Sequence, residues 1–200
     1  MSSKPWRRHA EVGHAVDDLL DAAGRAFATF GVASATMVDV ARTAGCSRAT
    51  LYRYFPDQES LHLAYVHRAT LRIAHQLAAD RAAGAPDTLV ERIVAGIAHV
   101  RADPLLAVWF EPENMAVPIT VSQSSTLLQT MSVGLIGQLN EPLGHDELQR
   151  RAEWMLRSIV MLLAMPGPDE DAERSMIEQF VVPVIATTSV IATTPVRSQT

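Results

Sequence analysis

The chain has 200 residues and a formal net charge of −5, with 48% hydrophobic and 20% charged residues. This length and composition exclude a disordered chain and allow a substantial core. The single cysteine, Cys46, excludes an internal disulfide and a cysteine-based zinc site. No apolar run approaches the roughly 20 residues of a membrane span, and the polar N-terminus lacks the apolar segment of a signal peptide. We therefore expect a soluble, cytoplasmic protein without a membrane partner.

The negative charge is concentrated in the later part of the chain. Residues 1–75 hold nine Lys/Arg and seven Asp/Glu, a balance of +2, whereas residues 76–200 hold eight and fifteen, a balance of −7. A basic first third on an acidic body favours an anionic partner at one end of the molecule.

Apolar residues recur at helical spacing between breaks marked by Gly and Pro. This spacing predicts helices at Val16–Phe30, Met37–Ala44, Arg48–Tyr54, Asp57–Ala83, Thr88–Arg101, Leu105–Phe110, about Ser122–Asn140, Asp146–Ala164 and Asp169–Val182. Pro183 is expected to kink or end the last helix. A strand in the β-branched run of residues 181–196 is the alternative, but one strand has nothing to pair with. The predicted fold is therefore all-α.

The segment Met37–Tyr54 fits a helix-turn-helix, in which two short helices cross at a steep angle across a tight turn. Such a motif needs a small residue at the crossing and a residue tolerant of positive φ in the turn. Ala41 and Gly45 meet these needs. Val40, Ala44, Cys46, Leu51 and Tyr54 are then expected to point inward, leaving Arg48, Ala49, Tyr52 and Arg53 on the outer face of the second helix. Arginine pairs bidentately with guanine and a tyrosine hydroxyl reaches a phosphate, so this face suits the major groove of DNA. The alternative is ordinary packing of two short helices.

The stretch from about Val16 to Leu61 resembles the DNA-binding module of the tetracycline-repressor (TetR) family. The matching pieces are Ala26-x-x-x-Phe30-Gly31, the Thr36…Val40-Ala41 segment, Ala44-Gly45-Cys46-Ser47, Leu51-Tyr52-x-Tyr54-Phe55, and the closing Glu59 and Leu61. The resemblance implies a homodimer formed mainly by the last two long helices, and a body that binds a small molecule to release DNA. It divides the chain into an N-terminal arm and helix-turn-helix domain at 1–62 with the motif at about 36–55, a ligand-binding and dimerisation domain at 63–187, and a flexible tail at 188–200.

Carried over by position, the resemblance implies that Thr36 and Tyr52 hold phosphates, that Arg48 and Ala49 face base edges, and that Arg53 lies at the groove or its rim. The DNA-contact candidates are Thr36, Val38, Ser47, Arg48, Ala49, Thr50, Tyr52, Arg53 and Gln58. Two positions depart from the family. Gln58 stands where a lysine usually opens the fourth helix, and Val38 stands where a polar base-reading residue is common. The operator sequence is therefore not predictable.

Three basic residues, Lys4, Arg7 and Arg8, precede the first predicted helix. They fit an arm that follows the phosphate backbone or enters the minor groove, or alternatively a solvated basic tail.

The body combines aromatic residues, thioethers and a few polar groups, a mixture that suits a largely apolar cavity. The ligand-binding candidates are Trp109, Phe110, Asn114, Met115, Met131 and Met155. The alternative is that these residues only pack the core. The Asp146–Ala164 and Asp169–Val182 helices carry more apolar residues than one core covers, so pairing with a second copy as a four-helix bundle is expected.

No enzyme or metal-site pattern is present. The sequence lacks H-E-x-x-H, GxxxxGK[ST], GxGxxG and GxSxG, so we expect no catalytic residues, no metal and no cofactor. The leading hypothesis is a ligand-responsive dimeric repressor that leaves an inverted-repeat operator on double-stranded DNA when a small, largely apolar inducer binds. The alternatives are an activator or architectural factor of this fold without an inducer, and a helical enzyme or carrier with an incidental helix-turn-helix.

Overall fold

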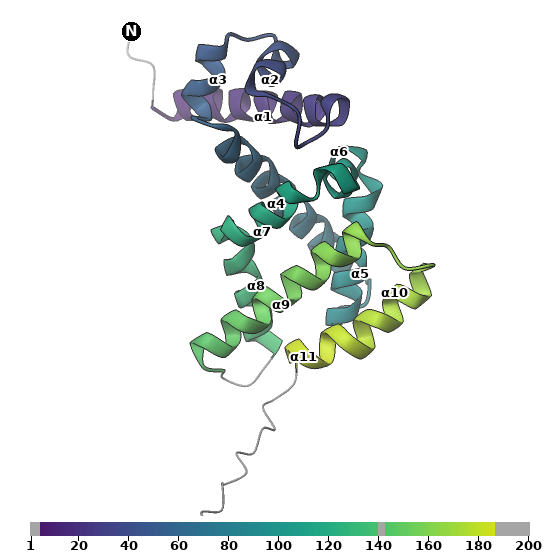
Figure 1. Ribbon diagram of the computed structural model, residues 1–200. Coiled ribbons are helices and arrows are strands. Elements are labelled where there is room, and N and C mark those ends of the chain that lie inside the picture. Colours follow the sequence, from purple (N-terminus) through teal and green to yellow (C-terminus); the bar gives the residue numbers. More distant parts are fainter. Residues whose placement is uncertain (1–4, 140–142, 187–200) are drawn as a thin grey trace, which may run out of the picture.

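The structure, a computed structural model, describes residues 5–139 and 143–186, and every regular element in these ranges is helical (Figure 1). The elements are α1 (Pro5–Phe30), α2 (Met37–Ala44), α3 (Arg48–Tyr54), α4 (Gln58–Ala82), α5 (Leu89–Ala102), α6 (Pro104–Ala107), η1 (Val108–Phe110), η2 (Pro112–Asn114), α7 (Ala116–Ser124), α8 (Thr126–Leu139), α9 (His145–Ala164), α10 (Glu170–Met176), η3 (Ile177–Val181, a π-helix) and α11 (Val182–Ala186). The all-α prediction is confirmed.

Helices α1, α2 and α3 form a small bundle at one end of the molecule, and the sequence fixes their ends locally (Figure 1). Thr36 opens α2 as one half of a capping box with Asp39, and Ser47 opens α3 by accepting a hydrogen bond from the Thr50 N–H at 3.1 Å. Each cap satisfies an N–H group that a helix start otherwise leaves without a partner. Both helices have the predicted bounds.

Helix α4 leaves this bundle and runs diagonally into the body (Figure 1). Its first turn is fixed by a capping box between Asp57 and Ser60. Leu61 and Tyr65 are buried in the same core as Phe27 and Leu51 of the bundle. That core continues past residue 62 to Leu106, Trp109 and Val121, so packing between the bundle and the body is continuous.

The rest of the body has a second core at the far end of the molecule. Ile136 of α8, Ile177 of η3 and Ile185 of α11 are almost completely buried, and they pack with apolar residues of α5 and α9. Arg101 of α5 donates to both carboxylate oxygens of the buried Glu173, at 2.6 and 2.7 Å. This ion pair fixes α10 against α5.

Several helices differ from the prediction in their bounds, and one region is helical that was not predicted to be. Helix α1 begins at Pro5 rather than near Val16, because proline suits the first turn of a helix, where its missing N–H costs nothing. The expected helix over residues 122–140 is interrupted at Ser125, whose hydroxyl accepts from the Leu128 N–H at 3.2 Å and so opens a new helix, α8. Residues 112–124 form η2 and α7, although no helix was predicted over residues 112–121.

Pro183 does not end the last helix, which continues to Ala186. The π-helix η3 lies directly before it. Proline in an α-helix clashes with the carbonyl four residues earlier, and a widened turn relieves that clash. The alternative of a strand starting at Val181 is wrong, because residues 181–186 are helical. The predicted tail at 188–200 lies outside the described residues.

Candidate DNA-binding surface and ligand cavity

A tight turn holds α2 and α3 together. Gly45 has φ 66°, a left-handed conformation that glycine adopts without steric cost, and the Cys46 N–H donates to the Ala41 carbonyl at 3.0 Å. Val40, Ala41 and Leu51 are buried at the crossing, while Ala44, Cys46 and Tyr54 are half-buried. All of the predicted inward residues thus lie on the inner side. The helices meet as a helix-turn-helix requires.

The outer face of α3 is basic and exposed. Arg48, Ala49, Tyr52 and Arg53 are all exposed there. Within the part of the chain that the structure describes, neither Arg48 nor Arg53 has a carboxylate partner. The Arg53 guanidinium lies 5.2 Å from the centre of the Tyr54 ring. The face therefore carries two positive charges that no acidic side chain of this region neutralises.

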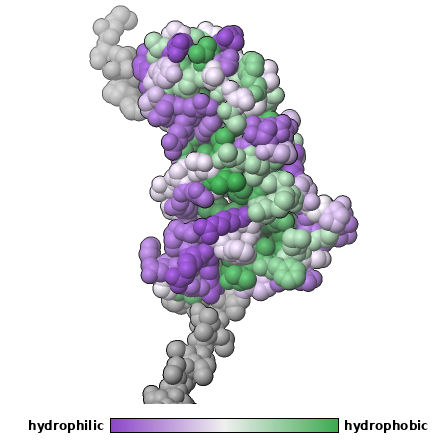
Figure 2. All heavy atoms as spheres, viewed as in Figure 1, coloured by the Kyte–Doolittle hydropathy of each residue, from purple (hydrophilic) through white to green (hydrophobic). Residues whose placement is uncertain are grey.

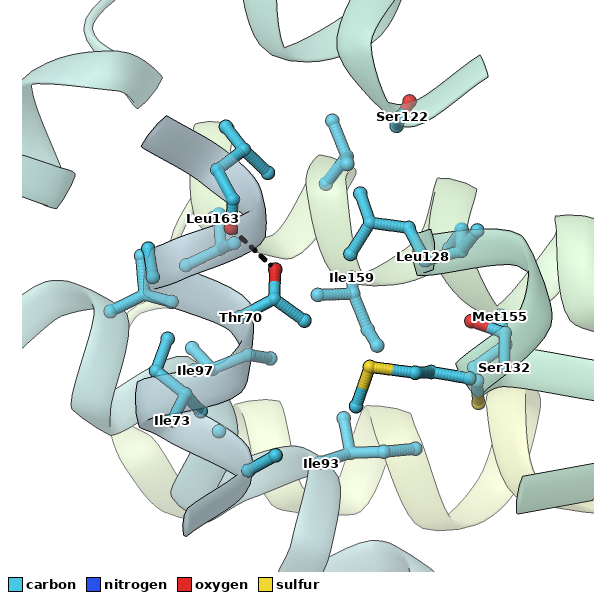
Figure 3. Close-up of a pocket in the computed structure, with 18 of the residues that line it drawn as sticks. Thr70, Ile73, Ile93, Ile97, Ser122, Leu128, Ser132, Met155, Ile159 and Leu163 are labelled. Carbon is cyan, nitrogen blue, oxygen red and sulfur yellow. Dashed lines mark hydrogen bonds between the residues drawn. The ribbon is translucent and has the colours of Figure 1, made fainter. Parts of the chain in front are cut away.

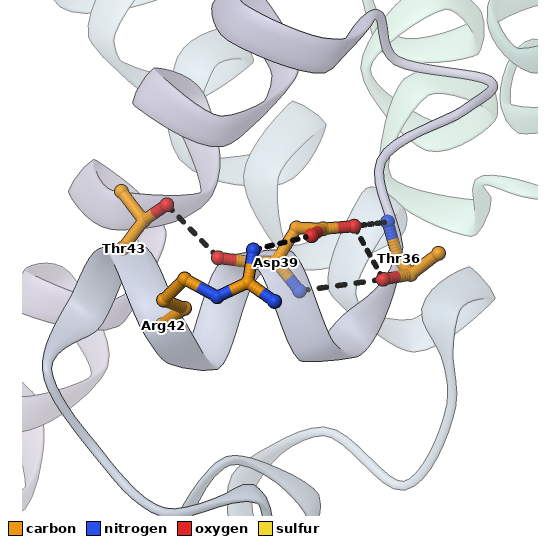
Figure 4. A network of polar contacts seen from close by, with 4 residues as sticks. All are labelled: Thr36, Asp39, Arg42 and Thr43. Carbon is orange, nitrogen blue, oxygen red and sulfur yellow. Dashed lines mark hydrogen bonds and ion pairs between the residues drawn. The ribbon is translucent and has the colours of Figure 1, made fainter.

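The entrance to α2 is a polar network of four residues (Figure 4). The Thr36 N–H donates to Asp39 Oδ2 at 3.1 Å, and Asp39 Oδ1 accepts from Arg42 at 3.1 Å. The hydrogen bonds from Thr36 and the charge of Arg42 lower the pKa of Asp39. The Thr36 hydroxyl donates its proton to Asp39 Oδ2, so it offers a DNA phosphate only its lone pairs. Its proton becomes available to a phosphate only if this network rearranges.

Four further DNA-contact candidates have roles within the bundle or are partly covered. The Ser47 and Thr50 hydroxyls lie 2.9 Å apart at the start of α3, and Val38 is half-buried. Gln58 is also half-buried and donates through Nε2 to the Ala35 carbonyl at 2.9 Å. Gln58 therefore holds the loop before α2, and a phosphate would have to compete for that amide.

The basic residues at the N-terminus fall on both sides of the described boundary. Lys4 lies outside the described residues. Arg7 and Arg8 lie within α1, so the expectation that they precede the first helix is wrong.

The body contains a cavity of about 450 Å³ between α4, α5, η1, α7, α8 and α9 (Figure 3). Its walls are mostly aliphatic, with Thr70, Ser122 and Ser132 as the hydroxyl-bearing residues. Of the predicted ligand residues, Trp109, Phe110, Met131 and Met155 line it. Helices α4 and α5 supply much of the cavity wall, which the sequence did not predict. The only sequence signal for their residues is the helical spacing of apolar side chains, a pattern that an ordinary core shares. The missed residues include Val66, Thr70, Ile73, Leu77, Ile93 and Ile97.

Asn114 and Met115 are corrections to that prediction, because neither lines the cavity. Asn114 is 1% exposed and joins the helix-turn-helix bundle to the body. Its Oδ1 accepts from the Ala33 N–H at 3.0 Å, and its Nδ2 donates to the Val108 carbonyl at 2.8 Å. A buried amide with both ends bonded to backbone is a structural connection.

An aromatic cluster of four residues lies at the same junction. Trp109 stacks on Tyr65 with ring centres 5.4 Å apart and meets Phe27 and His62 edge-on at 5.5 and 5.4 Å. Burial lowers the pKa of His62 to about 4, against a hydrogen bond to the Val32 backbone that raises it. Since Trp109 also lines the cavity, a ligand there would lie one side chain away from the bundle.

The far end of the molecule exposes hydrophobic side chains. Of the ten exposed large hydrophobic residues among those described, six lie on α9 and α10–α11 or directly after α9. They are Trp154, Met161, Met165, Met176, Phe180 and Val184, called the terminal apolar face below. Figure 2 shows hydrophobic residues gathered over these helices.

Within the described ranges, no three His, Cys, Asp or Glu side chains come together as a metal site. No single helix there is long and apolar enough to cross a membrane, and the helix pair that passes by length and composition is bent by 96°.

The helix-turn-helix with its basic outer face defines the class of protein, a helix-turn-helix DNA-binding regulator. Residues 19–65 match the family described as bacterial regulatory proteins, tetR family. The chain is 37% identical over 195 residues, 96% of either chain, to the HTH-type transcriptional regulator Rv1255c of Mycobacterium tuberculosis. It is 27% identical over 146 residues to the HTH-type transcriptional regulator Mb2274c of Mycobacterium bovis, covering 73% of this chain and 76% of the relative. The chain belongs to the TetR family of transcriptional regulators.

A crystal structure of a TetR-like transcriptional regulator from Rhodococcus sp. RHA1 aligns over 86% of this chain and 96% of its own. The identity is 20% and the TM-score is 0.47.

Proposed function

We propose that the protein is a cytoplasmic, homodimeric repressor that binds an inverted-repeat operator and is released when a small, largely apolar molecule enters the cavity. The observation that carries the proposal is the course of α4. Its first turns belong to the core of the helix-turn-helix bundle, and its later turns line the cavity. A ligand that favours one position of α4 would therefore change the position of the recognition helix.

On the DNA side, the proposal assigns base contacts to Arg48 and Ala49 and backbone contacts to Tyr52, Arg53 and Thr36. The exposure of the α3 face and its unneutralised arginines support this assignment. A single α3 reads one half-site, so a dimer reads an inverted repeat.

The terminal apolar face supports the homodimer. A monomer rarely leaves a contiguous set of large hydrophobic side chains in water, and a second copy of the same face would cover it by two-fold symmetry. Glu147, Arg150, Glu153 and Arg157 are partly or fully exposed on the same helix, α9, and pair along its surface, which suits a polar rim.

The cavity supports a ligand and disfavours an activator or architectural factor without one. Its volume of about 450 Å³ lies within the range of volumes of small-molecule sites in proteins. Ser132 is 5% exposed and lines the cavity, and within the described residues no hydrogen bond reaches its hydroxyl. This hydroxyl is available to a polar atom of a bound ligand.

The first test is selection of genomic DNA fragments by the purified protein at about 150 mM salt, a concentration at which non-specific phosphate binding is weakened. We expect enrichment of one short inverted repeat. Arg48→Ala should weaken binding to that repeat about 10- to 100-fold and leave binding to random DNA nearly unchanged. Arg72→Ala is the matched control, since Arg72 is a half-exposed arginine on α4 that belongs neither to the predicted DNA contacts nor to the terminal apolar face.

The proposed operator is contradicted if no sequence is enriched above a charge-matched control. The protein used must be shown by mass spectrometry to carry no bound small molecule. If Arg48→Ala binds the selected repeat with full affinity, the assignment of base contacts to the outer face of α3 is contradicted.

A further inference from the structure

The charged residues that line the ligand cavity are all basic. Among the described residues around it, Arg81 of α4 and Arg92 of α5 are the ones that carry charge, and no carboxylate lines the wall. They come from the end of α4 and the start of α5, which follow one another in the chain. The positive charge is therefore confined to one end of an otherwise uncharged cavity.

The two arginines share one carboxylate. Asp87 Oδ1 accepts from Arg92 Nε at 2.6 Å and from Arg81 Nη1 at 3.5 Å. In the described part of the chain, the other four guanidinium nitrogens make no hydrogen bond to protein. Two positive charges against one negative charge leave one unit of positive charge and several free donors at this end.

The neighbouring carboxylates are already engaged. Asp80 lies 2.9 Å from His99 Nε2, and Glu91 pairs with Arg174. Both acids border a second groove of about 310 Å³, which shares Leu77, Arg81 and Arg92 with the main cavity, and neither acid lines the main cavity itself. Neither acid forms an ion pair with Arg81 or Arg92, and among the described residues Asp87 is the only carboxylate that does.

The remaining walls suit an apolar body. The Thr70 hydroxyl donates to the Val66 carbonyl at 2.8 Å, and the Ser122 hydroxyl donates to the Ile119 carbonyl at 2.8 Å (Figure 3). Their protons are used within their own helices. Around them lie Ile73, Ile93 and Leu128, with Met155 opposite. Ser132 also lines this space, and its hydroxyl can meet one polar atom. Elsewhere on these walls a polar group would lose its water without replacement, so a ligand that fills the space must be mostly hydrocarbon.

We propose that the ligand is a monoanionic amphiphile of the fatty-acid class, with its hydrocarbon chain in the cavity and its carboxylate between Arg81 and Arg92. The inference rests on the proposed function, and names the chemistry of the molecule that the cavity takes. Guanidinium groups bind carboxylates through charge-assisted, often bidentate hydrogen bonds, and both arginines keep donors free for this.

The test is isothermal titration of the full-length protein with three probes of equal chain length: dodecanoate, dodecanol and dodecylammonium. We expect dodecanoate to bind about 10- to 100-fold more tightly than dodecanol, the range expected of a hydrogen bond to a charged group, and dodecylammonium to bind most weakly. The double variant R81Q/R92Q should bind dodecanoate and dodecanol equally, with the dodecanol affinity unchanged. R72Q, which removes a half-exposed arginine of α4 that does not line the cavity, should keep the wild-type preference.

Equal binding of the three probes by the wild type would overturn the proposal, as would an unchanged preference in the double variant. If the double variant does not fold, R81Q alone decides, because its arginine is largely exposed and its pairing with Asp87 is long. The preference of the single variant for dodecanoate over dodecanol should fall at least about threefold, since one of the two guanidinium groups is removed.

Operator release is measured separately, by fluorescence anisotropy of the selected DNA. If dodecanoate binds more tightly than dodecanol but releases no DNA, this inference is supported and the repressor mechanism is contradicted. If dodecanol releases the DNA as well as dodecanoate does, the repressor mechanism is supported and this inference is contradicted.

Discussion

Replacement of Asn114 by alanine tests the connection between the helix-turn-helix bundle and the body. The substitution removes the acceptor of the Ala33 N–H and the donor to the Val108 carbonyl, at a position that is 1% exposed. A buried polar group left without its partner costs about 1–3 kcal/mol. Ala33 is exposed, so water replaces part of the first bond, and the Val108 carbonyl keeps a long bond of 3.4 Å from the Glu111 N–H. We therefore expect Asn114→Ala to lower the free energy of unfolding by about 2–3 kcal/mol, near the lower end of the summed range.

Urea unfolding followed by circular dichroism measures this loss from the shift in midpoint at constant slope. Thr120→Ala is the matched control, because Thr120 is an exposed α7 residue that bonds only to its own helix, and a change within about 0.5 kcal/mol is expected there. If Asn114→Ala costs no more than the control, Asn114 does not join the two parts of the molecule and the reasoning is refuted.

Three other predictions concern a buried histidine, a turn and the terminal apolar face. The folded state holds His62 neutral with a pKa of about 4 against 6.5 in the unfolded chain, so its contribution to stability is complete above pH 6.5 and is lost as pH falls toward 4. His62→Leu should reduce the change of the urea midpoint with pH over that interval. An unchanged pH dependence of the midpoint would contradict the burial argument. Gly45→Ala should cost about 1–2 kcal/mol in thermal unfolding because φ is 66°. Gly134→Ala, within α8, where an added Cβ meets open space, should not destabilise the protein, and equal costs would refute the backbone explanation. Phe180→Asp should convert a dimer to a monomer in sedimentation velocity while leaving the helix content intact, and a monomeric wild type would remove the basis for this expectation.

The helix-turn-helix could be predicted from sequence because its determinants are local. Thr36 and Asp39 are three residues apart, as are Ser47 and Thr50, and the turn depends on the backbone of one residue, Gly45. Each of these signals can be read within a single helical turn. The bounds of α2 and α3 followed directly from them.

The body was less predictable because its decisive contacts are distant in sequence. Asn114 bonds to Ala33, which is 81 residues away, so its polar side chain next to aromatic residues was interpreted as part of a ligand site. Trp109 and Phe110 lie on the cavity wall, but the same sequence pattern also fits a filled core. Apolar spacing shows which face of a helix is buried, and only the packed structure shows where that face leaves space.

The length and continuity of α4 have a mechanical consequence. Its 25 residues form a rod of about 37 Å at 1.5 Å rise per residue. A tilt of about 5° at the cavity end would displace the opposite end by about 3 Å, comparable to a hydrogen-bond length. In the proposed mechanism the rod is a lever arm, which would turn a small strain around a ligand into a misfit between α3 and the DNA groove. A flexible joint introduced in its middle should leave binding at each end intact and abolish communication between them.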